Sequence, residues 1–400
     1  MKHKIWIVIL SIFCAFLVLT NAVTLLAYVG KGSKLDQLQD LIDEKFIGEA
    51  DPEALGDAAA EAMIQATGDR WSFYTPASQA QSFQEQMDNA YVGVGITIRM
   101  ADDNSGLLVL KVNPGGPAEA AGILPGDLLT EVEGQKTSEL GVDNARDLVR
   151  GPAGTTVELT ILRDGQESIY TVERQNITAV VAEGRMVTEN IGVVTIYNFD
   201  TRSSQETIEA IEDLQDQGAE KLIFDVRFNP GGFVHELVYT LDYLLPEGDL
   251  IRTVDYKGQE SLDTSDADFL DLPMAVLVNA DSYSAAEFFA AALQEYNAAQ
   301  VIGSKTSGKG YFQMTYYLKD GSSVNLSSGK YFTPSGLCLQ DIGIVPDVEI
   351  DADEELQIKI LGQTATDQED VQLQAAIQAL QDVDTQESAA PEVLETEAAA

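Results

Sequence analysis

The chain has 400 residues, 45% of them hydrophobic and 22% charged, so it can bury the cores of two or three domains and is not disordered throughout. It holds 65 Asp and Glu against 24 Lys and Arg, and this formal charge of −41 repels phosphate backbones and excludes nucleic-acid binding. With only two histidines, His3 and His235, it has no multi-histidine metal site, and its two cysteines build no disulfide framework.

The N-terminal segment predicts export. A basic flank precedes residues 5–29, which carry no charge and, at about 1.5 Å per helical residue, can cross a hydrocarbon core of roughly 30 Å. A cleavable signal peptide is the alternative, because Thr20-Asn21-Ala22 offers a small-x-small site. The apolar run continues past that site through Leu26, which favours a signal anchor over residues 1–30. We therefore expect a single-pass protein of the cell membrane with residues 31–400 on the extracytoplasmic side.

Residues 31–90 form a predicted helical segment. Leucines repeat at helical spacing from Leu35. A second helix starts with Asp51 as its N-cap and Pro52 at its first position, and it ends before Gly68. The turn that follows, residues 68–76, carries three aromatic side chains, among them Trp71. We interpret these aromatic side chains as packing residues.

Residues 91–175 resemble a circularly permuted bacterial PDZ domain. Three segments carry this resemblance: Gly93-Val94-Gly95-Ile96, residues 114–118 and residues 124–127. Residues 156–163 form a predicted strand that a hairpin turn at Asp164-Gly165 closes. In a PDZ domain the glycine-rich loop would bind a chain-terminal carboxylate while the next strand pairs with the peptide. The simpler alternative is a structural glycine turn in a small β domain.

Residues 176–365 alternate strands with helices, which predicts an α/β layer with parallel strands. Strands are expected at residues 191–199, 222–227, 275–279 and 301–303, and helices at residues 204–217, 235–245 and 284–296. Residues 366–400 are predicted to hold one helix, residues 370–380, and beyond Asp382 an acidic disordered tail.

Two strand-to-helix turns carry candidate chemistry. Residues 225–232 end in Pro-Gly-Gly, and the backbone N–H groups of Gly231 or Gly232 suit an oxyanion. In the second turn, Ser282 and Ser284 open a helix, where a hydroxyl is exposed and the helix dipole favours developing negative charge. Taken alone, either serine is more simply an N-cap.

A lysine lies between two glycines at residues 308–310. Gln313 lies four residues after Lys309, so on a strand both side chains would point to one face and Gln313 could orient the lysine amine.

Together these segments resemble the carboxy-terminal processing peptidases, the tail-specific serine protease family, over residues 35–380. The resemblance implies a PDZ domain followed by a Ser-Lys protease core of the ClpP/crotonase-like kind, with Ser284 as nucleophile, Lys309 as base and Gln313 as its support. Departures from the family pattern occur at four positions, none of which removes a catalytic atom: Phe228, Asp281, Tyr283 and Ala286.

The implied mechanism needs a neutral lysine, whose pKa of about 10.4 in water must fall to near 7. Backbone N–H groups of Gly231 or Gly232 and of Ala285 would hold the oxyanion. Three other residues are less favoured: Ser282 as nucleophile, Lys305 as base because it lacks the glutamine partner, and His235 as a triad member because the family has no histidine there.

The sequence thus predicts an α+β multidomain chain: a membrane anchor (1–30), a helical segment (31–90), a PDZ domain (91–175), an α/β serine protease core (176–365) and a tail (366–400). The expected activity is that of a membrane-anchored endopeptidase that captures protein C-termini and cleaves near them, without metal or cofactor. A homo-oligomer is compatible with the sequence. The alternatives are a catalytically silent PDZ adaptor and a crotonase-type acyl-CoA enzyme.

Overall fold

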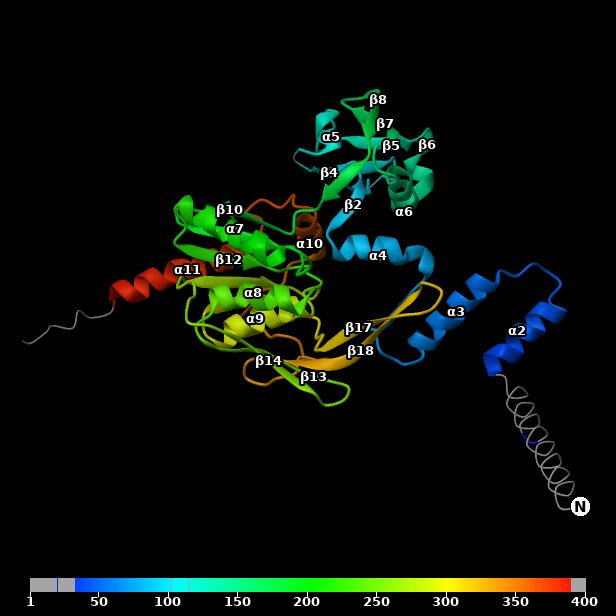
Figure 1. The fold of residues 1–400 in the computed structure, drawn as a ribbon. Coiled ribbons are helices and arrows are strands. Elements are labelled where there is room, and N and C mark those ends of the chain that lie inside the picture. The colour runs from blue at the N-terminus through cyan, green and yellow to red at the C-terminus, as the bar shows by residue number, and fades with distance from the viewer. Residues whose placement is uncertain (1–19, 21–32, 102, 114, 390–400) are drawn as a thin grey trace, which may run out of the picture. The chain divides into compact units, whose positions relative to one another are not determined.

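The computed structural model describes residue 20 and residues 33–389, except residues 102 and 114 (Figure 1). The predicted anchor at residues 1–30 therefore lies outside the described residues apart from Thr20. In the described part of the chain, no helix has the length and apolar character needed to span a membrane.

The chain divides into two units, Met1–Asp69 and Arg70–Ala400. Within its residues 33–69, which the structure describes, the first unit contains two helices, α2 (Lys34–Lys45) and α3 (Pro52–Gln65), and neither buries a side chain. As predicted, Asp51 caps α3, since its carboxylate accepts from the N–H of Glu53 at 2.9 Å. The second unit contains all the remaining elements.

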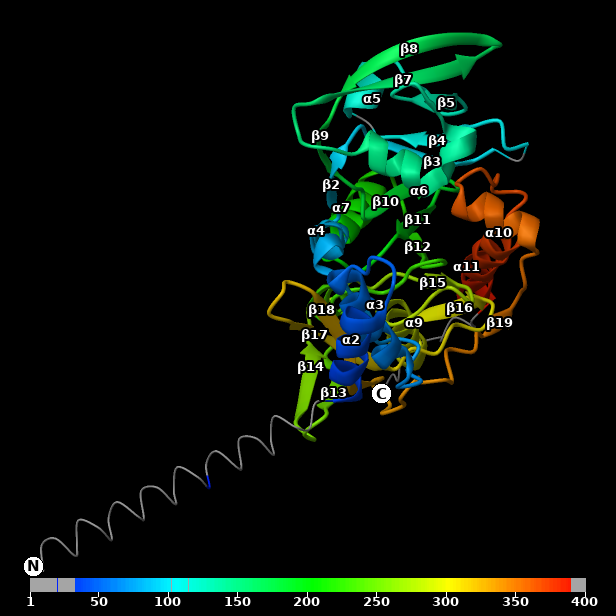
Figure 2. The same ribbon diagram turned by 90° about the vertical axis from the view of Figure 1, so that its right-hand side faces the viewer.

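A β-rich domain spans residues 90–178. Its main sheet has the order β3-β4-β5-β7-β8, and Figure 2 shows β7 and β8 as a long hairpin. The hairpin turn is the predicted one, with Asp164 at φ 52° and Gly165 at φ 79°. Leu107, Leu129 and Leu159 are fully buried between this sheet and the helix α6. The bounds of its elements are β2 (Ala90–Gly93), β3 (Ile96–Met100), β4 (Leu107–Val112), α5 (Pro117–Ala120), β5 (Leu128–Val132), β6 (Gln135–Lys136), α6 (Thr137–Val149), β7 (Thr156–Arg163), β8 (Gln166–Glu173) and β9 (Gln175–Thr178), which pairs with β2.

An α/β core follows, built on a six-stranded sheet in the order β10-β11-β12-β15-β16-β19. Strand β10 is antiparallel to β11, and the other pairs are parallel, as the alternation of strands and helices predicted. The bounds of the strands are β10 (Ala182–Met186), β11 (Ile191–Ile196), β12 (Lys221–Asp225), β15 (Met274–Val278), β16 (Ala299–Gly303) and β19 (Val348–Glu349).

Helices cover both faces of this sheet. Strand side chains alternate between the faces, so Phe224 packs with three helices on one face while Ile223 packs with a fourth helix on the other. The carboxyl ends of β12 and β15 therefore emerge between two hydrophobic layers, and both turns that carry candidate chemistry start there. The three helices of the first face are α7 (Ser203–Asp216), α8 (Val234–Leu244) and α9 (Ala285–Glu295), and the fourth helix is α11 (Val371–Ala389).

A second sheet, absent from the sequence-based expectations, has the order β1-β18-β13-β14, with β17 paired to β18. Its strands contain many serine, threonine and glycine residues and are half-exposed, so they lack the hydrophobic pattern that identifies a strand. The bounds are β1 (Phe73–Thr75), β13 (Gly248–Asp255), β14 (Glu260–Ser265), β17 (Tyr311–Tyr317) and β18 (Ser323–Phe332).

The C-terminal helix is longer than predicted. Helix α11 runs to Ala389 and not to residue 380, so the tail does not begin at Asp382. Residues 381–389 contain no glycine or proline that would interrupt the helix. The remaining short elements are the 3-10 helix η1 (Ala77–Gln79), α4 (Ala80–Met87) and α10 (Glu354–Leu361).

Candidate active site

Ser284 occupies a strained turn between β15 and α9. Its backbone lies at φ 59°, ψ −126°, a region that costs a non-glycine residue about 1–3 kcal/mol. Such a turn projects a serine hydroxyl at the start of a helix, where helix N–H groups face developing negative charge, as in the nucleophile turn of α/β-hydrolases. The strain identifies Ser284, and not Ser282, as the unusual serine of this segment.

The two strand-end turns are joined by hydrogen bonds that backbone N–H groups donate. The N–H of Phe228 donates to Asn279 Oδ1 at 2.9 Å, and the N–H of Tyr283 donates to the Asn229 carbonyl oxygen at 3.1 Å. The amide of Asn229 is fully buried and donates to the Ile196 carbonyl oxygen at 2.8 Å. The turn that holds the glycines is thus fixed against the turn that holds the candidate nucleophile.

Gly231 lies directly against Ser284. A Cβ atom added at Gly231 would come within 2.6 Å of the Ser284 Cβ, so no side chain fits there. Its N–H donates to Asn229 Oδ1 at 2.8 Å, which corrects the expectation that it serves as an oxyanion donor. Gly232 is exposed, and among the described residues no hydrogen bond engages its N–H or that of Ala285. These two N–H groups are therefore the available donors beside Ser284.

Ser282 has a structural role. It is fully buried, and its hydroxyl donates to the Val226 carbonyl oxygen at 2.8 Å and accepts from the N–H of Asn279 at 3.0 Å. The hydroxyl therefore holds the ends of β12 and β15 together. This contact argues against the alternative that Ser282 is the nucleophile.

The variant Ser282→Ala is expected to lose about 1–3 kcal/mol of unfolding free energy, because it leaves two buried backbone groups without this partner. It should retain peptidase activity, since Ser284 and its surroundings remain. Urea denaturation and a peptide-cleavage assay measure the two effects. A folded Ser282→Ala protein that is as inactive as Ser284→Ala would contradict the structural role.

Glu287 connects the serine turn to the lysine loop. This fully buried residue accepts from the N–H of Ser284 at 3.0 Å and from the N–H of Lys309 at 2.8 Å with one carboxylate oxygen. The other oxygen accepts from the Thr306 hydroxyl at 2.6 Å and from the N–H of Gly308 at 2.7 Å. One carboxylate thus fixes the backbones of both candidate catalytic residues. Sequence reasoning gave Glu287 no role, although a glutamate three residues after the serine is the pattern of a capping box.

The Lys309 side chain contacts two aromatic rings. Its Nζ lies 4.8 Å from the ring centroid of Trp71 and 5.5 Å from that of Tyr283. The two rings pack on each other with centroids 5.4 Å apart and an interplanar angle of 33°. Trp71, which we expected to be a packing residue, therefore contacts the candidate base.

Gln313 is not placed as its spacing from Lys309 suggested. Strand β17 starts at Tyr311, so Lys309 precedes it, and the pairing register shifts between Phe312 and Gln313. Residues four positions apart share a face only when both belong to one regular strand. Lys309 lies outside β17, so this rule does not relate it to Gln313. The Gln313 amide nitrogen donates to the Tyr311 carbonyl oxygen at 3.0 Å and to Ser327 Oγ at 3.1 Å. Gln313 therefore connects the start of β17 to β18 through these two hydrogen bonds.

Comparison with known proteins assigns the family. Models of peptidase family S41 and of the PDZ domain match residues 190–350 and 108–163. The chain is 30% identical to the "Probable CtpA-like serine protease" of Staphylococcus aureus (strain COL) over 375 residues, 89% of this chain and 75% of the relative. It is 33% identical to the "Carboxy-terminal processing protease CtpA" of Bacillus subtilis (strain 168) over 322 residues, 80% of this chain and 69% of the relative. The chain belongs to the carboxy-terminal processing proteases of family S41.

A solved structure shares the fold. A Bacteroides fragilis protein described as an S41 protease aligns over 88% of this chain and 98% of its own with a TM-score of 0.56 at 17% identity. Family membership makes this chain a serine protease with a PDZ domain, which removes the crotonase-type alternative and argues against a silent adaptor.

In the PDZ domain, the glycine loop is fixed through its carbonyl groups. The Val94 carbonyl oxygen accepts from the N–H of Ala118, and that of Gly95 accepts from the N–H of Asn113, both at 2.9 Å. Gly95 lies at φ 78°, a conformation that favours glycine. Within the described part of the chain, no hydrogen bond uses the N–H groups of Val94 or Gly95, so these donors suit a carboxylate.

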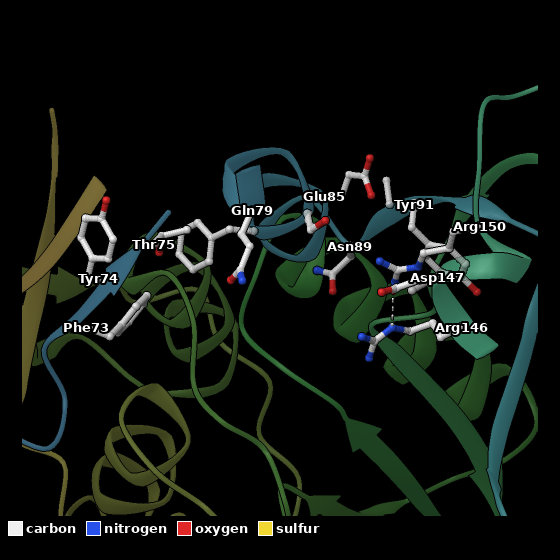
Figure 3. Close-up of a pocket in the computed structure, with 14 residues that line it drawn as sticks. Phe73, Tyr74, Thr75, Gln79, Glu85, Asn89, Tyr91, Arg146, Asp147 and Arg150 are labelled. Atoms are coloured by element: carbon white, nitrogen blue, oxygen red, sulfur yellow. Dashed lines mark ion pairs between the residues drawn. The ribbon is translucent and has the colours of Figure 1, made fainter. Parts of the chain in front are cut away.

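Away from the catalytic turns, α4, β1 and α6 border a cavity of about 670 Å³ (Figure 3). Figure 3 shows the aromatic residue Phe73 near one end and Arg146 and Arg150 near the other. The Arg150 guanidinium lies 5.2 Å from the ring centroid of Tyr91, whose pKa is raised by burial against the opposing effect of Arg150. Arg150 is therefore half-buried, with its guanidinium over an aromatic ring.

The two less favoured basic residues lie apart from this chemistry. Lys305 is exposed. His235 is also exposed, and its ring stacks on Phe233 with centroids 5.4 Å apart.

A buried acid adjoins the glycine turn. Gly232 packs on the backbone of Phe199 and Asp200, so closely that an added Cβ would lie 2.7 Å from the Asp200 nitrogen. Asp200 is 6% exposed, and burial, with the nearby Glu236 carboxylate, raises its pKa to about 7. The folded protein therefore retains this proton at pH values where an unfolded chain releases it.

The contribution of Asp200 to stability should consequently fall as pH rises through the interval from about 4 to about 7, because the folded state binds the extra proton there. The variant Asp200→Asn removes this contribution. Relative to wild type, it should gain on the order of 3 kcal/mol between pH 4 and pH 7.5. Urea denaturation of both proteins at the two pH values measures the gain. A stability difference that does not change with pH would contradict the assignment.

Proposed function

We propose that this protease is anchored in the cell membrane, captures protein C-termini with its PDZ domain and cleaves near them with a dyad of Ser284 and Lys309. The observation that carries the dyad is the Glu287 carboxylate, which accepts the N–H groups of both residues. The strained backbone of Ser284 gives independent support.

In the proposed reaction, neutral Lys309 takes the proton of the Ser284 hydroxyl while Ser284 Oγ attacks the peptide carbonyl carbon. The N–H groups of Gly232 and Ala285 hold the negative oxygen that forms, and each such donor is typically worth about 10²–10³ in rate. The ammonium of Lys309 then protonates the leaving amine, and water hydrolyses the acyl-enzyme with Lys309 again as base. No metal or cofactor takes part in these steps.

The substrate would enter through its C-terminus. The N–H groups of Val94 and Gly95 provide the carboxylate site, and β3, which starts at Ile96, provides an edge for an extended peptide. We therefore propose protein substrates with free C-termini.

Membrane anchoring rests on the uncharged run of residues 5–29. It would place the protease domains on the extracytoplasmic side. Alkaline carbonate extraction of membranes tests this proposal. The full chain should remain with the membrane, whereas a chain without residues 1–30 should not, and release of both would contradict the anchor.

A pair of peptides tests the catalytic proposal. One has a free C-terminal carboxylate and the other is the same peptide with a C-terminal amide. Wild type should cleave the first faster than the second, and Ser284→Ala should cleave neither. Equal rates for the two peptides would contradict carboxylate capture, activity in Ser284→Ala would contradict the nucleophile, and binding without cleavage by wild type would favour the adaptor.

A further inference from the structure

The amine of the proposed base lies beside two aromatic rings that no step of the reaction uses. Its nitrogen is within 5.5 Å of the ring centroids of both Trp71 and Tyr283. An aromatic face attracts a cation and not a neutral amine, because the ring quadrupole is negative above and below the plane. The two rings therefore stabilise the form of Lys309 that cannot act as a base.

Burial by the same rings acts in the opposite direction, because desolvation favours the neutral amine. Lys309 is only half-buried, so its amine keeps access to water and desolvation is incomplete. Trp71 and Tyr283 are also half-buried. We therefore expect the attraction between the cation and the rings to dominate in the protein without substrate.

Three charged groups contact the two rings or the lysine backbone, and they come from three segments of the chain. The Arg70 guanidinium lies over the ring of Trp71, 4.4 Å from its centroid. Its positive charge favours loss of a proton from Lys309. Glu287 lies on the backbone side and accepts the N–H of Lys309. Asp281 lies in the turn before α9 and, after burial, is the second cause of the raised pKa of Tyr283. Both carboxylates favour the ammonium.

We propose that Tyr283 and Trp71 are positioning residues that hold Lys309 as an ammonium in the resting enzyme. Before catalysis, this ammonium gives a proton to water and the amine turns from the rings toward Ser284. This inference rests on the proposed role of Lys309 as base. The family pattern has alanine at the position of Tyr283. The contact between Tyr283 and Lys309 is therefore a feature of this chain and not of the family pattern.

The variant Tyr283→Leu tests the inference, because leucine keeps an apolar side chain but has no π face. The acidic limb of its pH profile of kcat/KM should move down by about half a pH unit to one unit. Tyr283→Phe is the matched control, since it keeps the ring, and its limb should stay within a few tenths of wild type. A limb that does not move, or moves up, in Tyr283→Leu would overturn the inference.

A direct titration separates this inference from the proposed dyad. Lysine labelled with ¹³C at Cε reports the amine by NMR in the inactive Ser284→Ala background, and Lys309→Arg identifies the signal. The midpoint for Lys309 should fall by the same amount with Tyr283→Leu, and with Trp71→Leu if the first variant does not fold. An unchanged midpoint overturns the inference even if Lys309 is the base, whereas a lowered midpoint with full activity in Lys309→Ala overturns only the dyad.

Discussion

Replacing Lys309 by alanine is expected to lower kcat/KM for a peptide with a free C-terminus by about 10⁴-fold or more. A general base alone typically contributes about 10²–10⁴, and residues that act as one unit lose most of their joint contribution when either is removed. The fold should persist, because the Lys309 side chain is half-buried and its backbone N–H, which Glu287 accepts, is kept in alanine. Circular dichroism and urea denaturation measure the fold, and peptide cleavage measures the rate.

Lys305→Ala is the matched control for this prediction. Lys305 lies in the same loop, but its side chain is exposed. Its removal changes the charge by the same amount and should leave kcat/KM close to that of wild type. A loss in Lys305→Ala as large as in Lys309→Ala would show that the loop needs positive charge and not a base at one position.

The variant Glu287→Gln is expected to reduce both stability and activity. Its carboxylate accepts four hydrogen bonds in a fully buried position, and an amide can accept only on its oxygen, so two backbone or hydroxyl donors lose their partner. Leaving such groups unsatisfied costs about 1–3 kcal/mol each. A displacement of about 1 Å between the serine turn and the lysine loop can cost about 10²-fold in rate.

Glu295→Gln separates these effects from those of losing any carboxylate that accepts several hydrogen bonds; Glu295 is half-buried. Glu295 ends the same helix and accepts from the Thr333 hydroxyl and from the N–H and hydroxyl of Ser335, but it touches neither catalytic turn. The variant Glu295→Gln should have a lower stability than wild type, without a loss in kcat/KM comparable to that of Glu287→Gln. If both variants lose activity in proportion to stability, the positioning role of Glu287 is wrong.

The sequence predicted the elements whose hydrophobic pattern is strong. The buried strands ending before Phe228 and Asn279 lie between two apolar layers, and the alternation with helices left few arrangements other than a parallel sheet. The position of Ser284 at a helix start was predicted for the same reason. The polar strands of the second sheet were not predicted, because exposed serine and threonine residues carry no periodic signal.

Contacts between distant segments were the main omission from the sequence-based account. Trp71 and Lys309 are far apart in the chain, and no local pattern relates them. The hydrogen bond that occupies the N–H of Gly231 depends on the fold of the Asn229 side chain onto its own turn. The spacing argument for Gln313 does not apply, because Lys309 precedes β17 and the pairing contains a register shift, so support of Lys309 by Gln313 stays a prediction.

The identity of the nucleophile is tested most directly by trapping the acyl-enzyme. Wild type is mixed with an activated ester of a peptide, acidified before deacylation and digested, and the modified residue is located by fragment-ion mass spectrometry. We predict an acyl group on the oxygen of Ser284 and none in Ser284→Ala. An acyl group on Ser282 or elsewhere, or continued peptide cleavage by Ser284→Ala, would contradict the proposed mechanism.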